Sequence, residues 1–139
     1  MKTSILHLLI SLCTVQALAQ QTINSAADFE KLVLKAREQH KPIFLDFYTT
    51  WCVPCQQMDK VVFNRSDVQQ LLGNQYTSAR IDAGTKFGYL LKQQFKVAAY
   101  PTFLYLDNER VPLHTEVGRL DPEAFLILTK RILTIYAAN

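Results

Sequence analysis

Two cysteines separated by two residues are the part of this sequence best suited to chemistry. Cys52 and Cys55 enclose Val53 and Pro54, and the one other cysteine, Cys13, lies near the amino terminus. A disulfide between partners this close restricts the unfolded chain very little, because it closes almost no loop. We therefore expect the pair to react, exchanging a dithiol for a disulfide with other proteins.

Two other uses of these cysteines remain open from the residues alone. The pair could form a structural disulfide, or it could supply half of a zinc site, since C-x-x-C is also a zinc motif. A closed zinc site needs four ligands, and beyond residue 19 the only histidines are His40 and His114. Nothing in the sequence places either histidine near Cys52, so we expect neither a metal nor another cofactor.

Residues 1–19 are predicted to be a secretory signal peptide. Lys2 supplies the positive end, Ile5–Val15 the apolar stretch and Ala17–Ala19 a small-residue cleavage site, with the cut after its last alanine. The apolar stretch is shorter than the roughly 20 residues that span a bilayer. Retention as an anchor, or lipid attachment at Cys13, is the alternative. The prediction is export, to the periplasm of a Gram-negative cell or into the medium.

The remaining residues, 20–139, are predicted to form one domain. Half of the chain is hydrophobic (49%) and 19% is charged, the balance of an ordinary globular protein. The net charge is +3 and would fall by the single charge of Lys2 on cleavage. Because this charge is small and the basic residues are scattered, we expect no nucleic-acid partner.

Periodicity predicts helices and strands in alternation, which implies a largely parallel sheet between helices, with an antiparallel hairpin at one side. The predicted elements are a helix at 25–39, a strand at 43–48, a helix at 53–63, a short helix stopped by Gly73-Asn74, a strand at 76–82, a helix at 86–95, strands at 102–106 and 113–117, and a final helix capped by Asp121.

The predicted elements place the cysteines where a strand ends and a helix begins. The strand at 43–48 is almost continuously apolar, as in a strand covered on both faces. Pro54 is tolerated in the first turn of the following helix. A thiolate at a helix N-terminus is stabilised by unpaired N–H groups, which can lower cysteine pKa values to about 3.5–7.5. Cys52 is then the nucleophile, and Cys55 attacks the mixed disulfide to release the product.

The residues around the cysteines resemble a known family. The run from Asp46 to Cys55 is similar to the active-site stretch of thioredoxins, Tyr100-Pro101-Thr102 is similar to their cis-proline loop, and Gly118 matches a glycine of their last strand. The resemblance covers residues 43–125. The pattern of Met58, Val62-Phe63 and Val68 is in addition similar to exported thioredoxin-like domains, including the C-terminal domain of the bacterial transmembrane disulfide reductant carrier. The resemblance implies an α/β thioredoxin fold, a single domain whose central mixed sheet is flanked by helices.

The resemblance also implies roles for individual residues. Asp46 matches the buried aspartate that helps to deprotonate the second cysteine, and burial should raise its pKa. From the residues alone, Asp46 could equally be a hydrogen-bonded core residue without a catalytic part. Pro101 matches the proline whose cis peptide bond lies beside the cysteines. Substrate contacts are implied for Trp51, Pro54, Tyr100 and Pro101.

Three positions depart from the family pattern. Val53-Pro54 replaces the Gly-Pro of ordinary thioredoxins, and this dipeptide influences the redox potential. The lysine that thioredoxins place near the buried aspartate falls at about Ser78. Arg80 is close by, but strand alternation is expected to point it elsewhere, as a solvated surface charge. Tyr100 replaces a smaller residue, which could narrow the range of substrates.

From these observations we predict an enzyme that reduces protein disulfides outside the cytoplasm, as a monomer supplied with electrons by a membrane donor. An exported oxidase or isomerase would use the same cysteines in the other direction. The lack of a large inserted helical domain disfavours a dedicated oxidase. The third possibility is a binding protein whose cysteines turn over slowly.

Overall fold

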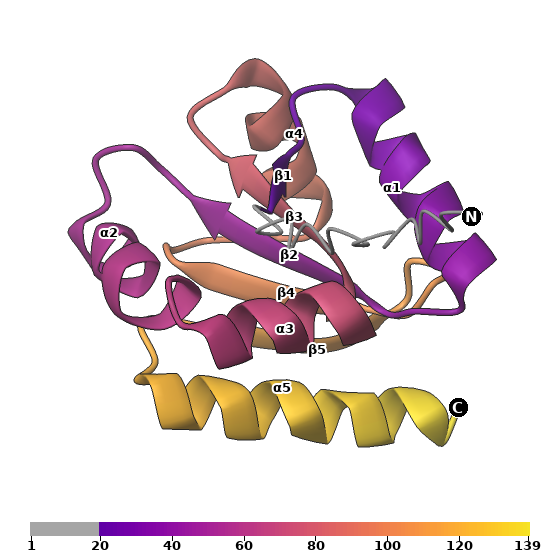
Figure 1. Ribbon diagram of the computed structural model, residues 1–139. Coiled ribbons are helices and arrows are strands. Elements are labelled where there is room, and N and C mark those ends of the chain that lie inside the picture. The colour runs from indigo at the N-terminus through magenta and orange to yellow at the C-terminus, as the bar shows by residue number, and fades with distance from the viewer. Residues whose placement is uncertain (1–19) are drawn as a thin grey trace, which may run out of the picture.

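The computed structural model describes residues 20–139, so the predicted signal peptide and Cys13 lie outside the described residues (Figure 1). The elements are β1 (Gln21–Thr22), α1 (Ala26–Gln39), β2 (Ile43–Tyr48), α2 (Val53–Met58), the π-helix η1 (Asp59–Phe63), α3 (Ser66–Gln75), β3 (Thr77–Asp82), α4 (Lys86–Gln94), β4 (Thr102–Leu106), β5 (Pro112–Val117) and α5 (Pro122–Ala137).

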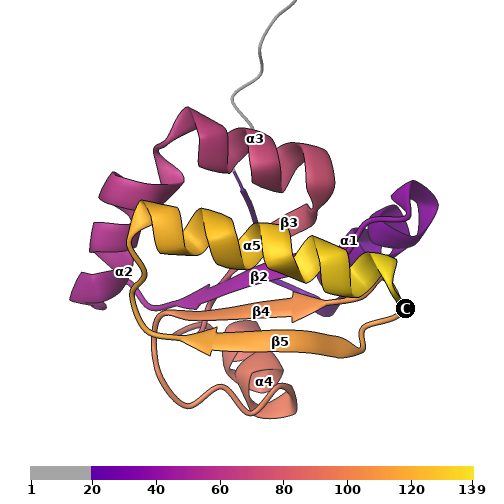
Figure 2. The same ribbon diagram turned by 90° about the horizontal axis from the view of Figure 1, so that it is seen from below.

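The strands form one mixed sheet in the order β1-β3-β2-β4-β5. β1, β3 and β2 run parallel, whereas β4 is antiparallel to both β2 and β5. Helices cover both faces: α1 and α4 lie on one face, and α2, α3 and α5 on the other (Figures 1 and 2). Their buried side chains belong accordingly to two separate core clusters. The predicted thioredoxin fold, a mixed sheet flanked by helices, is confirmed.

β2 lies at the centre of the sheet and is buried as its apolar sequence predicts. Ile43, Leu45 and Phe47 pack on the side of α1 and α4, while Phe44 points to the side of α2, α3 and α5. There Phe44 contacts a cluster of aromatic rings from Phe63, Tyr76, Phe103, Tyr105 and Phe125. Because side chains alternate along a strand, Asp46 shares the face of Phe44 and faces the cysteine helix.

Side-chain caps fix the N-termini of two helices, and the cap at Asp121 is the one that the sequence predicts. The Ser25 hydroxyl accepts a hydrogen bond from the Asp28 N–H at 3.2 Å, and the Asp121 carboxylate accepts one from the Ala124 N–H at 2.8 Å. Such caps typically contribute about 1 kcal/mol, since they satisfy N–H groups that have no partner within the helix. Within residues 20–139, no helix is both long and apolar enough to cross a membrane.

Several predicted bounds differ from the observed ones by a single residue, and three differences are larger. The sequence analysis missed β1, which has only two residues and no alternating pattern. Gly73-Asn74 does not stop α3, which continues to Gln75; Leu72 and Tyr76 are both buried, and their packing outweighs the glycine signal. The helix predicted at 53–63 is an α-helix only to Met58 and continues as the π-helix η1.

Candidate active site

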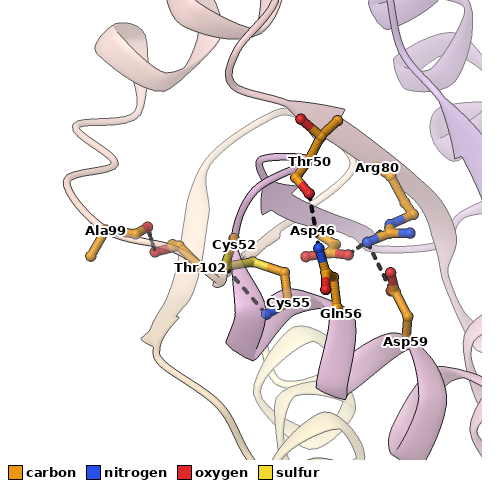
Figure 3. The surroundings of a disulfide bond; sticks show 9 residues. All are labelled: Asp46, Thr50, Cys52, Cys55, Gln56, Asp59, Arg80, Ala99 and Thr102. Carbon is orange, nitrogen blue, oxygen red and sulfur yellow. Dashed lines mark hydrogen bonds and ion pairs between the residues drawn. A yellow bond between two sulfur atoms is a disulfide. The ribbon is translucent and has the colours of Figure 1, made fainter.

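Cys52 and Cys55 are joined by a disulfide at the N-terminus of α2 (Figure 3). Cys52 is the N-cap residue, and its Sγ accepts a hydrogen bond from the Cys55 N–H at 3.2 Å. Both cysteines are buried, with 3% and 2% of their surfaces exposed. A Cys52 thiolate in this position would face the unpaired N–H groups and the positive end of the helix dipole, which favour negative charge.

The residues beside the disulfide are exposed even though the sulfurs are covered. Trp51 is 73% exposed and Val53 is 59% exposed, both high values for apolar side chains. The loop before the helix is held by Gln56, whose side-chain amide donates to the Thr50 carbonyl at 3.0 Å. Sequence reasoning missed Gln56, because no pattern indicates a contact between a helix side chain and the preceding turn.

Asp46 lies on β2, on the face that α2 covers, and its side chain is only 1% exposed. One carboxylate oxygen, Oδ2, accepts a hydrogen bond from Arg80 Nε at 2.8 Å. The other, Oδ1, is buried without a hydrogen-bond partner among the described protein atoms. Burial raises the pKa of Asp46 from its ordinary value of 3.8 to about 6, and the Arg80 charge opposes this rise without cancelling it.

Arg80 is not the solvated surface charge that the sequence analysis predicted. In the parallel pairing of β2 with β3 it stands opposite Asp46, on the same face of the sheet. Its Nη2 lies 2.9 Å from Asp59 Oδ1 of η1 and forms an ion pair with it, without a hydrogen bond. The guanidinium also stacks over the Tyr48 ring, 4.2 Å from the centroid.

Arg80 therefore links the strand that carries Asp46 to the helix that follows the cysteines (Figure 3). Sequence reasoning missed this link and the part of Asp59 in it. Alternation shows which residues of one strand share a face, and this is the one sequence signal for both residues. Only the register between β2 and β3 places Asp46 opposite Arg80. Ser78, the position that matches the family lysine, instead directs its hydroxyl to the Leu72 carbonyl at 3.4 Å.

The predicted cis-proline loop precedes β4, and its Tyr100–Pro101 peptide bond is cis, as expected. The Pro101 carbonyl accepts the Gly118 N–H at 2.8 Å, and Gly118 has a φ of 100°, a conformation that favours glycine. The Tyr100 ring packs edge-to-face with Trp51, with 6.2 Å between the ring centroids. The structure thus brings Tyr100 together with Trp51, two of the predicted substrate contacts.

His40 and His114 are the two histidines that the sequence analysis considered as possible zinc ligands. His40 is the C-cap residue of α1, and His114 on β5 pairs with Glu116 at 3.0 Å. Within residues 20–139 no group of three or more His, Cys, Asp or Glu side chains is arranged to hold a metal ion. Cys52 and Cys55 are bonded to each other, and among residues 20–139 Asp46 is the one buried carboxylate.

Comparison with known proteins agrees with this geometry. The family described as thioredoxin-like matches residues 22–108. The thiol:disulfide interchange protein DsbD of Salmonella typhi is 32% identical over 93 residues, which cover 65% of this chain and 16% of that protein. This chain thus spans about a sixth of the length of such relatives.

Two solved structures are similar over most of the chain. The solution structure of a putative disulphide-isomerase from Bacteroides thetaiotaomicron is 28% identical, with a TM-score of 0.70 over 83% of this chain and 92% of that one. The oxidised C-terminal domain of DsbD from Neisseria meningitidis is 20% identical, with a TM-score of 0.66 over 81% and 98% of the two chains. At 20% identity, the likeness to the second structure shows a shared fold and nothing more.

Proposed function

This chain belongs to the thioredoxin-like family, and on that premise we propose that it reduces protein disulfides outside the cytoplasm through Cys52 and Cys55. The observation that carries the proposal is the disulfide at the N-terminus of α2, where the Cys52 sulfur accepts the Cys55 N–H. The extracytoplasmic setting rests on the predicted signal peptide. Relatives named as thiol:disulfide interchange proteins support the type of chemistry.

In the proposed reaction, the Cys52 thiolate attacks one sulfur of a substrate disulfide and forms a mixed disulfide, while the other substrate sulfur leaves as a thiolate. Cys55 then loses its proton and attacks the Cys52 sulfur. The second substrate thiolate leaves, and the Cys52–Cys55 disulfide remains. Two electrons pass to the substrate in each cycle, so a dithiol donor must reduce the pair again. We propose a membrane protein as that donor.

Asp46 is proposed to accept the proton of Cys55. A carboxylate with a pKa of about 6 is largely ionised at pH 7, so it can accept a proton. Because this pKa lies close to pH 7, the group can also release the proton readily. Its buried oxygen without a hydrogen-bond partner, Oδ1, is free to take a proton. Trp51, Pro54, Tyr100 and Pro101 are proposed to contact the substrate around the sulfurs, as the family resemblance implies.

The test is the reduction potential of the cysteine pair. The mature protein is equilibrated with glutathione or dithiothreitol buffers, free thiols are trapped, and Cys52→Ser and Cys55→Ser serve as controls. A potential near −270 mV, about that of thioredoxin, supports the reductase, whereas a value near −120 mV points to an oxidase. If the pair does not exchange reversibly in either buffer, the catalytic proposal fails and a binding protein becomes the better account.

An isomerase is the second candidate function, and one comparison favours it. The similar structure from Bacteroides thetaiotaomicron is titled a putative disulphide-isomerase. An isomerase keeps its cysteines reduced, yet it restores activity to a protein with scrambled disulfides without net electron transfer. Refolding of a scrambled protein in a buffer that holds Cys52 and Cys55 reduced separates the two functions, since a pure reductase yields only the reduced substrate.

A further inference from the structure

A row of four side chains leads away from the disulfide along the surface to α4. Trp51 packs against Tyr100 with 6.2 Å between ring centroids. The Lys92 ammonium lies 5.4 Å from the centroid of the same Tyr100 ring and 5.8 Å from that of Tyr89. We call Trp51, Tyr100, Lys92 and Tyr89 the aromatic row.

The aromatic row has the composition of a binding surface. Trp51 is 73% exposed and Tyr89 is 54% exposed, so large rings stand in solvent at both ends of the row. Exposed aromatic side chains are unfavourable in water, and such residues are enriched at the centres of protein interfaces. Neither ring is needed to complete the core of the fold.

Lys92 gives the aromatic row a positive charge. It is half-buried between the rings of Tyr89 and Tyr100, three residues from Tyr89 on the same face of α4. Among the described residues, no carboxylate lies within ion-pair distance of its ammonium. The other described lysines are unpaired as well, but only Lys92 has its ammonium over two aromatic rings. A cation held in place by rings and unmatched by an anion favours a partner that brings a negative charge.

We propose that the aromatic row binds the segment of a substrate protein that flanks its reacting cysteine, and that it selects segments carrying a carboxylate. This inference rests on the proposed function, because it takes the disulfide as the place where the substrate is anchored. The separations keep Lys92 within about 12 Å of the Trp51 ring, a length that an extended chain covers in about four residues. The preferred carboxylate is therefore expected within about four residues of the reacting cysteine.

The test uses two peptides with one internal disulfide that differ only in having glutamate or glutamine three residues from a cysteine. The readout is the ratio of the two kcat/KM values, which cancels differences in overall activity between variants. We expect the wild-type protein to prefer the glutamate peptide by about two- to fivefold at low salt, the range of an exposed ion pair, and to lose the preference at high salt. Lys92→Gln should abolish the preference, and Lys92→Glu should reverse it.

The matched control is Lys130→Glu, an identical change of charge on the exposed face of α5. It should leave the preference as it is in the wild-type protein. Equal kcat/KM values for both peptides with the wild-type protein would overturn the proposal. So would a Lys130→Glu variant that changes the preference as much as Lys92→Glu does, because the effect would then come from net charge.

A second readout keeps the proposal separate from the catalytic one. Trp51 is the single tryptophan of the chain, so its fluorescence reports binding of versions of the two peptides in which serine replaces cysteine. Tighter binding of the glutamate version, together with no thiol exchange on the disulfide peptides of the first assay, would support the aromatic row and contradict the proposed function. Thiol exchange on the disulfide peptides, without a preference for the glutamate peptide in either assay, would support the proposed function and contradict the aromatic row.

Discussion

The most direct perturbation of the site is Asp46→Asn, which keeps the size of the side chain and removes its charge. Asp46 is 1% exposed, and burial raises its pKa from 3.8 to about 6 despite the hydrogen bond from Arg80 at 2.8 Å. Between these two pH values the folded protein binds a proton that the unfolded chain releases. The free energy of unfolding therefore falls as the pH rises through this window.

The expected magnitude follows from the two pKa values. A difference between 3.8 and about 6 corresponds to about 3 kcal/mol of stability that is present below pH 4 and lost once the pH exceeds 6. Asparagine does not titrate, so the Asp46→Asn variant should lack this loss. We expect it to match the wild-type protein within about 1 kcal/mol near pH 4 and to exceed it by up to about 3 kcal/mol at pH 8.

The assay is urea unfolding of both oxidised proteins between pH 4 and 8, followed by circular dichroism. Taking the difference between the two proteins removes the contribution of every other titrating group. Asp59→Asn is the matched control, because Asp59 is also paired with Arg80 but is 41% exposed; its stability difference should stay small at every pH. An Asp46→Asn variant less stable than the wild-type protein at pH 8 would refute the reasoning, since the Arg80 pair would then outweigh the cost of burial.

Three further substitutions test other contacts. Arg80→Gln leaves the effect of burial on Asp46 unopposed, so the pKa of Asp46 should rise further in a ¹³C NMR titration of its carboxyl carbon; an unchanged or lower pKa contradicts the ion pair. Tyr76→Phe removes the hydroxyl that donates to the Thr129 carbonyl at 2.6 Å, and urea unfolding should show a loss of about 1 kcal/mol, whereas an unaltered midpoint would mean that the bond contributes nothing. Gly118→Ala meets no atom within 4 Å but must adopt a φ of 100°, so thermal unfolding should show a cost of about 1–3 kcal/mol, and no cost would mean that the turn relaxes freely.

Strong local patterns made most of the fold predictable. The strand at 43–48 was predicted with the bounds that β2 has, because a strand buried on both faces is almost continuously apolar. The position of the cysteines followed from it, since a helix had to start within a few residues of the strand end.

Features that depend on how distant segments align were not predictable in this way. The pairing of Asp46 with Arg80 needs the register of β2 against β3, which alternation within each strand leaves open. β1 is defined by its pairing with β3, a segment more than 50 residues away in the sequence. The aromatic row likewise combines residues from a loop, a helix and a turn, so no sequence window contains it.

The π-helix η1 has a consequence for how the length of this chain can vary. η1 carries two contacts in five residues: Asp59 pairs with Arg80, and Val62 packs in the core. Deleting one residue here would rotate one contact relative to the other by about 100°. Lys60 and Val61 are exposed. Relatives that keep both contacts should therefore vary in the identity of these two residues but conserve their number.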